Sequence, residues 1–227
     1  MPLRSAGTGA VPRDPVHHPL FARSYARVSV ALESRGMSGV RARLLAGLSG
    51  RVVEIGAGNG LNFAHYPGAV AEVVAIEPER GLRRLAVEAA VRCAVPVDVV
   101  PGTAEALPVK SEAFDAAVVS LVLCSVRDVP RALAELRRVL RPGGELRFFE
   151  HGRGGGPAMR ATQRALDRTV WPPLSGGCHL SRDTVAALRD AGFELGPYRR
   201  LSIPERGPKL PPSFCVLGTA WRPAGTA

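Results

Sequence analysis

The chain has 227 residues, and 46% of them are hydrophobic, which is enough for one compact domain with a full core. Its formal charge of +10 first suggests a nucleic-acid ligand. Lys110 and Lys209 are the only lysines, however, and the arginines are scattered along the sequence without a dense basic run or interleaved aromatic residues. This pattern indicates an arginine-rich solvated surface and argues against a nucleic-acid groove.

The cysteines and the N-terminus indicate a reduced, cytoplasmic protein. Cys93, Cys124, Cys178 and Cys215 lie far apart, form no C-x-x-C pair and show no zinc-binding spacing with the histidines, so we expect no metal. Residues 1–16 lack the apolar segment of a signal peptide and are predicted to be a disordered arm. No run of about 18 apolar residues occurs, so we expect no membrane-spanning helix.

Helical and strand-like segments alternate along the rest of the chain. Apolar residues at helical spacing predict an N-terminal helix in 20–34 and a shorter one around 40–45. Beyond them, the alternation predicts an α/β fold, in which helices cover both faces of a parallel sheet. The predicted strands are 51–55, 71–77, 97–100, 114–123 and 145–151, and the predicted helices are one that starts at 61–66 and those at 79–91, 129–140, 158–171 and 182–191.

The C-terminal part differs from this alternation. The last two predicted strands, 198–203 and 214–221, are too close in sequence for a crossover helix, so they should pair antiparallel at one edge of the sheet. For the helix at 182–191, Ser181 is a candidate N-cap, and Gly192 stands just beyond the end, where glycine is favoured.

The segment "VVEIGAGNG" ends the first strand of the predicted sheet in a glycine loop. Gly56, Gly58 and Gly60 permit positive φ angles and leave out side chains that would block a ligand. In an open parallel sheet, ligands bind beyond the carboxyl ends of the strands, at such a loop. Glu77 lies 21 positions after Gly56, at the end of the next strand, where a carboxylate can accept both hydroxyl protons of a ribose.

A nicotinamide dinucleotide is the first alternative for this loop. Its G-x-G-x-x-G pattern uses a third glycine to bring a helix N-terminus to the pyrophosphate, but Leu61 stands at that position here. Glu54, just before the loop, would repel a phosphate and suits a cationic ammonium or sulfonium group. The sequence therefore favours a positively charged nucleoside.

The segments "VVEIGAGNG", "IEP" and "RVLRPGGELRFFEH", in this order, resemble the class I S-adenosylmethionine-dependent methyltransferases. The resemblance extends over residues 45–220 and implies S-adenosylmethionine as the cofactor. It implies a Rossmann-like, seven-stranded, mostly parallel sheet with helices on both faces and a terminal antiparallel β-hairpin. We expect a single domain, 17–227, in which an N-terminal helical lid, 17–48, precedes the Rossmann-like core, 49–227.

By the same resemblance, the glycine loop and the neighbouring strand ends would form the cofactor site. Glu54 and the loop would lie beside the methionine part, with Ser120 and Leu121 at its border, and Glu77 beside the ribose. Ala104 and Glu105 would lie beside the adenine, in a segment where many relatives have an aspartate at the position of Thr103. Asn59 and Asn62 suit helix-start positions equally well. The expected cofactor contacts are Glu54, Gly56, Ala57, Gly58, Asn59, Gly60, Asn62, Glu77, Pro78, Thr103, Ala104, Glu105, Ser120 and Leu121.

The segments "NFAHYP", "SLVLCSV" and "GGCHLSRDT" narrow the resemblance to mammalian alkyl-thiol methyltransferases and their bacterial relatives. The mammalian proteins have an apolar N-terminal membrane segment that this chain lacks. The chain also lacks the N/D-P-P-Y/F sequence of amino-group DNA and RNA methyltransferases and the acidic magnesium site of catechol-type enzymes. We therefore expect methyl transfer to a small molecule, foremost a thiol. The alternative is O-, N- or C-methylation of a natural product, quinone or lipid precursor.

Candidate residues for the chemistry follow from position. His151 ends the fifth strand and is the candidate catalytic base or thiolate-stabilising cation; otherwise it is a hydrogen-bonded histidine at the rim of the sheet. Phe21 and Tyr25 lie on the N-terminal helix, which would cover the cofactor as a lid that expels water, or would simply pack against the domain. Cys124, Cys178 and His179 complete the candidate substrate pocket, although a structural role suits them as well.

Two other classes of function stay open from the sequence. The chain could be a non-catalytic cofactor-binding protein, or an RNA-binding module that uses its positive charge. The partners that we expect are a small-molecule methyl acceptor, with no nucleic acid and no membrane span, and a chain that is a monomer or a weak dimer.

Overall fold

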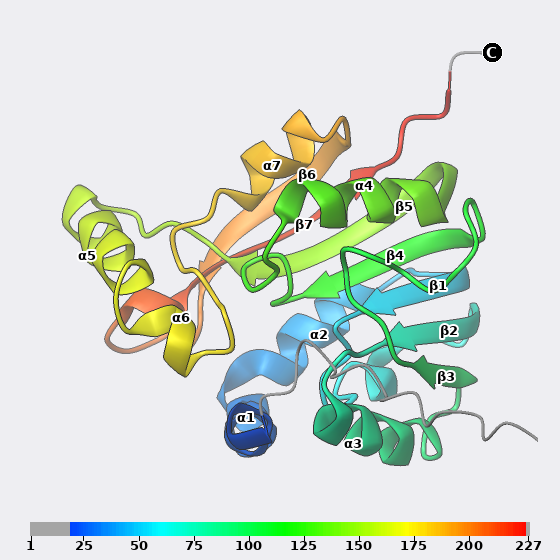
Figure 1. The fold of residues 1–227 in the computed structure, drawn as a ribbon, viewed down its shortest axis with the longest axis horizontal. Coiled ribbons are helices and arrows are strands. Elements are labelled where there is room, and N and C mark those ends of the chain that lie inside the picture. The colour runs from blue at the N-terminus through cyan, green and yellow to red at the C-terminus, as the bar shows by residue number, and fades with distance from the viewer. Residues whose placement is uncertain (1–18, 226–227) are drawn as a thin grey trace, which may run out of the picture.

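The computed structural model describes residues 19–225, and Figure 1 shows how their elements are arranged. The arm predicted at 1–16 and the first two residues of the predicted lid lie outside this range. Seven strands form one sheet in the order β3-β2-β1-β4-β5-β7-β6. The strands are β1 Gly50–Ile55, β2 Val70–Ile76, β3 Val97–Val100, β4 Phe114–Ser120, β5 Leu140–His151, β6 Glu194–Ser202 and β7 Phe214–Trp221.

The strand pairing confirms the mostly parallel sheet and the terminal hairpin. Strands β1 to β5 pair parallel with their neighbours, whereas β7 pairs antiparallel with both β5 and β6. The hairpin therefore forms one edge of the sheet. The strand order reverses at β1, because β2 lies on one side of it and β4 on the other. Ligands bind beside the carboxyl ends of such a pair of strands.

Helices lie on both faces of the sheet, as predicted. Figure 1 shows α4 and α7 over one face, α1 to α3 on the other side, and α5 and α6 beyond the carboxyl ends of the parallel strands. The helices are α1 Pro19–Leu32, α2 Ser38–Leu45, α3 Arg80–Ala90, α4 Val129–Val139, α5 Pro157–Asp167, α6 Trp171–Leu174 and α7 Thr184–Asp190; a π-turn, Glu33–Met37, joins α1 to α2, and two 3-10 turns are Phe63–His65 and Pro211–Ser213.

Two buried clusters hold the helices to the sheet. Val53 of β1 packs in one cluster with Leu133 and Leu136 of α4, whereas its neighbour Val52 packs in the other with Leu45 of α2. Successive side chains of a strand point to opposite faces, so a strand covered on both faces is apolar at nearly every position. Full burial of each such side chain contributes about 1.5–3 kcal/mol to folding. The consecutive apolar residues Val52 and Val53 of β1 follow from this double burial.

The helix predicted to start at 61–66 is only the 3-10 turn Phe63–His65. Pro67 follows Tyr66, and a proline disfavours the α conformation in the residue before it. Tyr66 accordingly has an extended backbone, with φ −65° and ψ 129°. The prediction of a longer helix was wrong, because Pro67 ends the helical turn at Tyr66.

The N-cap predicted for α7 was also wrong. Ser181 donates its hydroxyl proton to Asp167 Oδ2 at 2.6 Å, and Asp183 caps α7 by accepting the backbone N–H of Ala186 at 3.1 Å. Gly192 is confirmed as the residue that ends this helix, because it has φ +76° and its N–H bonds back into the last turn.

None of the helices within 19–225 is long and apolar enough to cross a membrane.

Candidate active site

A cavity of about 500 Å³ lies at the carboxyl ends of the parallel strands. Its size suits a small-molecule or cofactor site. The predicted residues that line it are Phe21, Tyr25, Gly56, Gly58, Glu77, Pro78, Thr103, Ala104, Glu105, Ser120 and Leu121. Five of the expected cofactor contacts, Glu54, Ala57, Asn59, Gly60 and Asn62, are not part of the lining.

The glycine loop passes under this cavity in a conformation that favours glycine. Gly56, Gly58 and Gly60 have φ angles of +67°, +58° and +78°. A Cβ atom on Gly60 would lie 2.8 Å from the side chains of Phe63 and Ala89, so this glycine also permits close packing behind the loop. The loop therefore needs glycine both for its backbone shape and for its contacts.

Glu77 joins the end of β2 to the glycine loop. Its Oε2 accepts the backbone N–H of Gly58 at 2.7 Å, and its Oε1 accepts that of Glu79 at 2.8 Å. Only 4% of the residue is exposed, and burial raises the pKa of its carboxyl group to about 7. Each carboxylate oxygen has a second lone pair and can accept one more hydrogen bond from a ligand in the cavity.

Glu54 lies behind the loop in a buried polar network. Asn62 Nδ2 donates to its Oε1 at 2.8 Å, and the Tyr66 hydroxyl donates to its Oε2 at 2.7 Å. Arg41 of α2 donates to Asn62 Oδ1 at 2.7 Å and to Glu33 at 2.9 Å, which connects the N-terminal segment to the loop. Burial raises the pKa of Glu54 to about 7. The sequence predicted a cationic partner for Glu54, but its two oxygens accept hydrogen bonds from neutral side chains.

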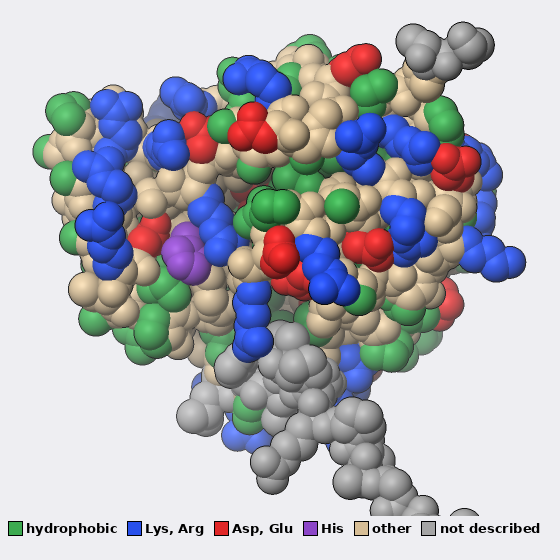
Figure 2. All heavy atoms as spheres, turned by 45° about the horizontal axis from the view of Figure 1, so that its top comes forward, with side chains coloured by type: hydrophobic (Ala, Val, Ile, Leu, Met, Phe, Trp, Pro, Cys, Tyr) green, Lys and Arg blue, Asp and Glu red, His purple; other side chains and the backbone are tan. Residues whose placement is uncertain are grey.

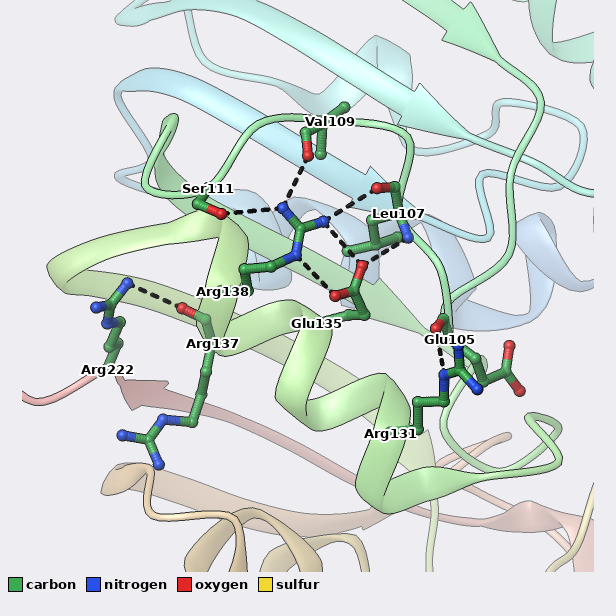
Figure 3. Close-up of polar contacts among 9 residues, drawn as sticks. All are labelled: Glu105, Leu107, Val109, Ser111, Arg131, Glu135, Arg137, Arg138 and Arg222. Atoms are coloured by element: carbon green, nitrogen blue, oxygen red, sulfur yellow. Dashed lines mark hydrogen bonds and ion pairs between the residues drawn. The ribbon is translucent and has the colours of Figure 1, made fainter.

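The segment after β3, which carries Thr103, Ala104 and Glu105, is held by α4 (Figure 3). Arg138 of α4 donates to the carbonyl oxygens of Leu107 and Val109 and forms a two-pronged ion pair with Glu135. Glu135 in turn accepts the backbone N–H of Leu107 at 2.8 Å, and Arg131 Nε donates to the Glu105 carbonyl at 2.9 Å. These bonds place one wall of the cavity.

The segment after β4 forms the opposite wall through a strained residue. Leu121 has φ +60°, a conformation that costs a non-glycine residue about 1–3 kcal/mol. The buried carboxylate of Glu150 in β5 holds the chain just after it, because it accepts the backbone N–H groups of Val122, Leu123 and Cys124 at 2.9–3.0 Å. Glu150 was not among the predicted site residues, although an acid directly after Phe148 and Phe149 was a signal for a buried carboxylate.

The N-terminal helix contributes two aromatic side chains to the cavity. The rings of Phe21 and Tyr25 lie 5.7 Å apart, and Asn59 of the glycine loop donates to the Ser29 hydroxyl of the same helix at 3.1 Å. Gly176 also lines the cavity, and a Cβ atom there would lie 2.7 Å from the Phe21 ring. The consecutive glycines in "SGGC" were a signal for this close approach that the sequence analysis missed.

His151 and the two candidate pocket cysteines do not line the cavity but meet beside it. Cys178 Sγ lies 3.2 Å from His151 Nδ1, and the ligand atoms of Cys124, His151 and Cys178 lie within 4.8 Å of one another. His179, also outside the lining, donates its backbone N–H to the Cys124 carbonyl at 2.8 Å. Sequence spacing had suggested no cluster of cysteine and histidine.

A second hollow, of about 630 Å³, lies between α4 and α7. It is the larger of the two, but it contains neither the glycine loop nor Glu77. Volume therefore does not identify the site; the glycine loop, the Glu77 carboxylate and the strand ends, which meet at the smaller cavity, identify it.

Figure 2 shows basic side chains over much of one face, with acidic ones among them, and a row of basic groups over α5.

The comparisons with known proteins agree with this geometry. Residues 53–148 match the family model of a methyltransferase domain. Human thiol S-methyltransferase TMT1B is 34% identical over 182 residues, which are 78% of this chain and 73% of that protein. The ubiquinone/menaquinone biosynthesis C-methyltransferase UbiE of Syntrophotalea carbinolica is 31% identical over 144 residues, which are 62% of this chain and 60% of that protein.

A solved structure shows the same fold. It is a SAM-dependent methyltransferase of Thermotoga maritima, described as a possible histamine N-methyltransferase, with a TM-score of 0.66 and 24% identity over 89% of this chain and 96% of its own. The chain belongs to the class I S-adenosylmethionine-dependent methyltransferases. It is an enzyme, and its cofactor is S-adenosylmethionine.

Proposed function

We propose that this enzyme methylates the sulfur of a small-molecule thiol. The observation that carries the proposal is its 34% identity to a thiol S-methyltransferase over 78% of the chain. A cavity of about 500 Å³ with Phe21, Tyr25 and Leu121 in its lining suits a small, partly apolar acceptor. A thiol requires less activation by the protein than a hydroxyl does, because thiols are the more acidic groups (the cysteine side chain has a pKa of about 8.5) and the thiolate is a strong nucleophile.

The cavity residues fit the cofactor, and we assign them to its parts. Glu77 accepts hydrogen bonds from the ribose hydroxyls with the lone pairs that Gly58 and Glu79 leave free. The segment with Thr103, Ala104 and Glu105 lies along the adenine. The glycine loop, Ser120 and Leu121 lie by the methionine part. Glu54, Asn59 and Asn62 act behind the lining, by holding the loop in shape.

When bound, the cofactor would supply a methyl group on a sulfonium: the acceptor sulfur would form a bond to the methyl carbon in line with the breaking bond, and the cofactor's sulfur would leave as a neutral thioether. The protein's contribution is to position the acceptor and to exclude water, since alignment of two reactants removes much of the barrier. Phe21 and Tyr25 cover the cavity from the N-terminal helix, so we assign this helix the role of a lid. The lid and the core then form one functional unit.

The catalytic role of His151 stays a prediction. Its ring contacts Cys178 and lies outside the cavity lining, so a direct proton transfer to or from the acceptor needs a movement of the ring or of the acceptor. A positioned general base contributes about 10²–10⁴-fold to a rate. If His151 acts on the acceptor, His151→Ala should lower turnover by an amount in this range and leave the affinity for S-adenosylmethionine unchanged.

C-methylation of a quinone precursor is the second candidate, and the 31% identity to UbiE favours it. Incubation of the enzyme with methyl-labelled cofactor and a panel of alkyl thiols, phenols, amines and a demethylated quinone separates the candidates. We expect transfer to thiols at least about tenfold faster, in kcat/KM, than to any other class, a difference of about 1.4 kcal/mol. Transfer to the quinone alone would replace the thiol proposal.

A further inference from the structure

Three side chains that ligate soft metals meet beside the cavity. Cys124 follows β4, His151 is the last residue of β5, and Cys178 lies between α6 and α7. Cys178 Sγ is 3.2 Å from His151 Nδ1, and the three ligand atoms lie within 4.8 Å of one another. The three residues lie more than twenty residues apart in the sequence, so only the folding of the chain brings them together.

These separations suit a tetrahedral zinc ion. Zn–S bonds of about 2.3 Å and Zn–N bonds of about 2.0–2.1 Å place the ligand atoms of a tetrahedral site roughly 3.4–3.8 Å apart. The observed atoms need to move by less than about 1–1.5 Å to reach these distances, which rotation of the side chains provides. Two thiolates and an imidazole are a donor set for zinc rather than for magnesium or calcium.

The backbone around the three ligands is already fixed. Glu150 Oε2 accepts the N–H of Cys124 at 3.0 Å, and His151 is paired with β7 in the sheet. The N–H of His179, next to Cys178, donates to the Cys124 carbonyl at 2.8 Å and ties the two cysteine segments together. A site whose ligands are held before the metal arrives loses little entropy on binding.

The surroundings are those of a shielded thiolate site. Cys124 is fully buried and Cys178 is 5% exposed, and Leu180 and Trp171 pack against them. The buried indole N–H of Trp171 interacts with the Cys178 thiol. A metal-bound thiolate accepts hydrogen bonds from such neighbouring donors, which tune the site. Trp171 supplies a donor of this kind next to the Cys178 sulfur.

We propose that Cys124, His151 and Cys178 form a binding site for Zn²⁺. On binding, each thiol loses its proton to solvent and each sulfur donates a pair of electrons to the metal. Three protein ligands leave a fourth position open, as in catalytic rather than structural zinc sites. Ser125 and Gly177, the chain neighbours of Cys124 and Cys178, line the cavity, so the ion lies directly behind its wall. The proposal holds for any methyl acceptor.

Metal analysis of untagged enzyme, kept reduced with a phosphine, tests the proposal. We expect one zinc per chain, and a zinc affinity that falls by at least about 100-fold in Cys124→Ser and in Cys178→Ser when a chromophoric chelator competes for the metal. Cys93→Ser is the matched control, because this half-buried cysteine lies outside the cluster, and it should bind zinc like the unaltered enzyme. Equal loss in the control, or no loss in the cluster variants, would overturn the proposal.

Two further readouts keep the test independent of folding and of activity. Co²⁺ bound to the unaltered enzyme should show sulfur-to-metal charge-transfer absorption, and Zn²⁺ should raise its melting temperature. Absence of both under reducing conditions would mean that the three groups form only a hydrogen-bonded cluster. His151→Ala should lower the metal content if the ring is a ligand, whereas a role as a base alone should lower turnover and leave the metal content unchanged. The acceptor panel could thus disprove thiol methylation while the metal analysis supports the zinc site, and the metal analysis could disprove the zinc site while thiol methylation is supported.

Discussion

Glu77 Oε2 accepts the backbone N–H of Gly58 at 2.7 Å, so a carboxylate at the end of β2 fixes the glycine loop at the end of β1. One side chain thereby shapes the loop and faces the cavity. If Glu77 binds the ribose as we propose, its protonation should control cofactor binding, because a protonated carboxyl group accepts hydrogen bonds less well than a carboxylate.

The affinity for S-adenosylmethionine should therefore depend on pH. Burial raises the pKa of Glu77 to about 7, and ribose hydroxyls favour the charged form. Binding then selects the deprotonated enzyme, so affinity should fall by up to about tenfold for each pH unit below 7. Calorimetric titration on both sides of pH 7 measures this. Glu77→Gln should bind more weakly but lose this pH dependence; the same dependence in both proteins would contradict the assignment.

Glu54 should make the fold less stable as the pH rises. Burial raises its pKa from 4.5 to about 7, so the folded state binds the proton more tightly than the unfolded state does. Its contribution is fully present below pH 4.5 and is lost as the pH rises to about 7, by up to about 3 kcal/mol.

Urea unfolding of Glu54→Gln checks this prediction. The glutamine oxygen can accept from Asn62, and its amide can donate to the Tyr66 hydroxyl, which turns to accept. The variant should fold and should show a smaller decline in unfolding free energy between pH 4.5 and 7. A decline of unchanged size would assign the effect to other groups.

Alanine substitutions at two glycines with nearly the same φ should separate the cost of backbone strain from the cost of steric crowding. Gly47 has φ +77° with open space around its Cβ position, whereas a Cβ atom on Gly60, at φ +78°, would lie 2.8 Å from Phe63 and Ala89. Gly47→Ala should cost about 1–2 kcal/mol, and Gly60→Ala about 1–3 kcal/mol more. Denaturant unfolding measures both. Equal losses would show that the loop can shift to admit a methyl group.

The lid can be tested on one helix with its own control. Phe21 lines the cavity, whereas Val28 of the same helix is 54% exposed. Phe21→Ala should lower kcat on the best acceptor by up to about 100-fold, because the acceptor is then less well aligned and water can enter. Val28→Ala should leave it unchanged. Steady-state kinetics measures kcat for both variants. If kcat is unchanged in both, α1 only packs against the domain and does not act as a lid.

Binding to RNA should be weak and strongly salt-dependent. Basic side chains are interspersed with acidic ones on the face in Figure 2, and the sequence has no aromatic platform within a basic run. Filter binding at increasing salt should show affinity falling steeply as counterions compete. Tight binding that survives physiological salt would restore a nucleic-acid role.

Several features of the fold were predicted because they depend on local physics. A strand buried on both faces is a short apolar run, glycines at positive φ mark the loop after β1, and Gly192 ends α7. The short link between the last two strands required a hairpin. Two local predictions were wrong where two sequence signals competed. Pro67 limits the predicted helix after the glycine loop to a single turn. Asp183, and not Ser181, caps α7, because the Ser181 hydroxyl donates to Asp167.

The sequence by itself determined the parallel sheet, the glycine loop and the carboxylate at Glu77, since these lie within one strand–loop–strand unit. Only the tertiary structure decided that Glu54 faces Asn62 and Tyr66, and that Cys124 and Cys178 meet at His151. Glu54, Asn62 and Tyr66 belong to one strand–loop unit, and the fold of that loop turns the two side chains toward Glu54. Cys124, His151 and Cys178 come from three segments, which strand order and the packing of loops at the ends of β4 and β5 bring together. Spacing along the chain does not tell which of these three distant segments become neighbours.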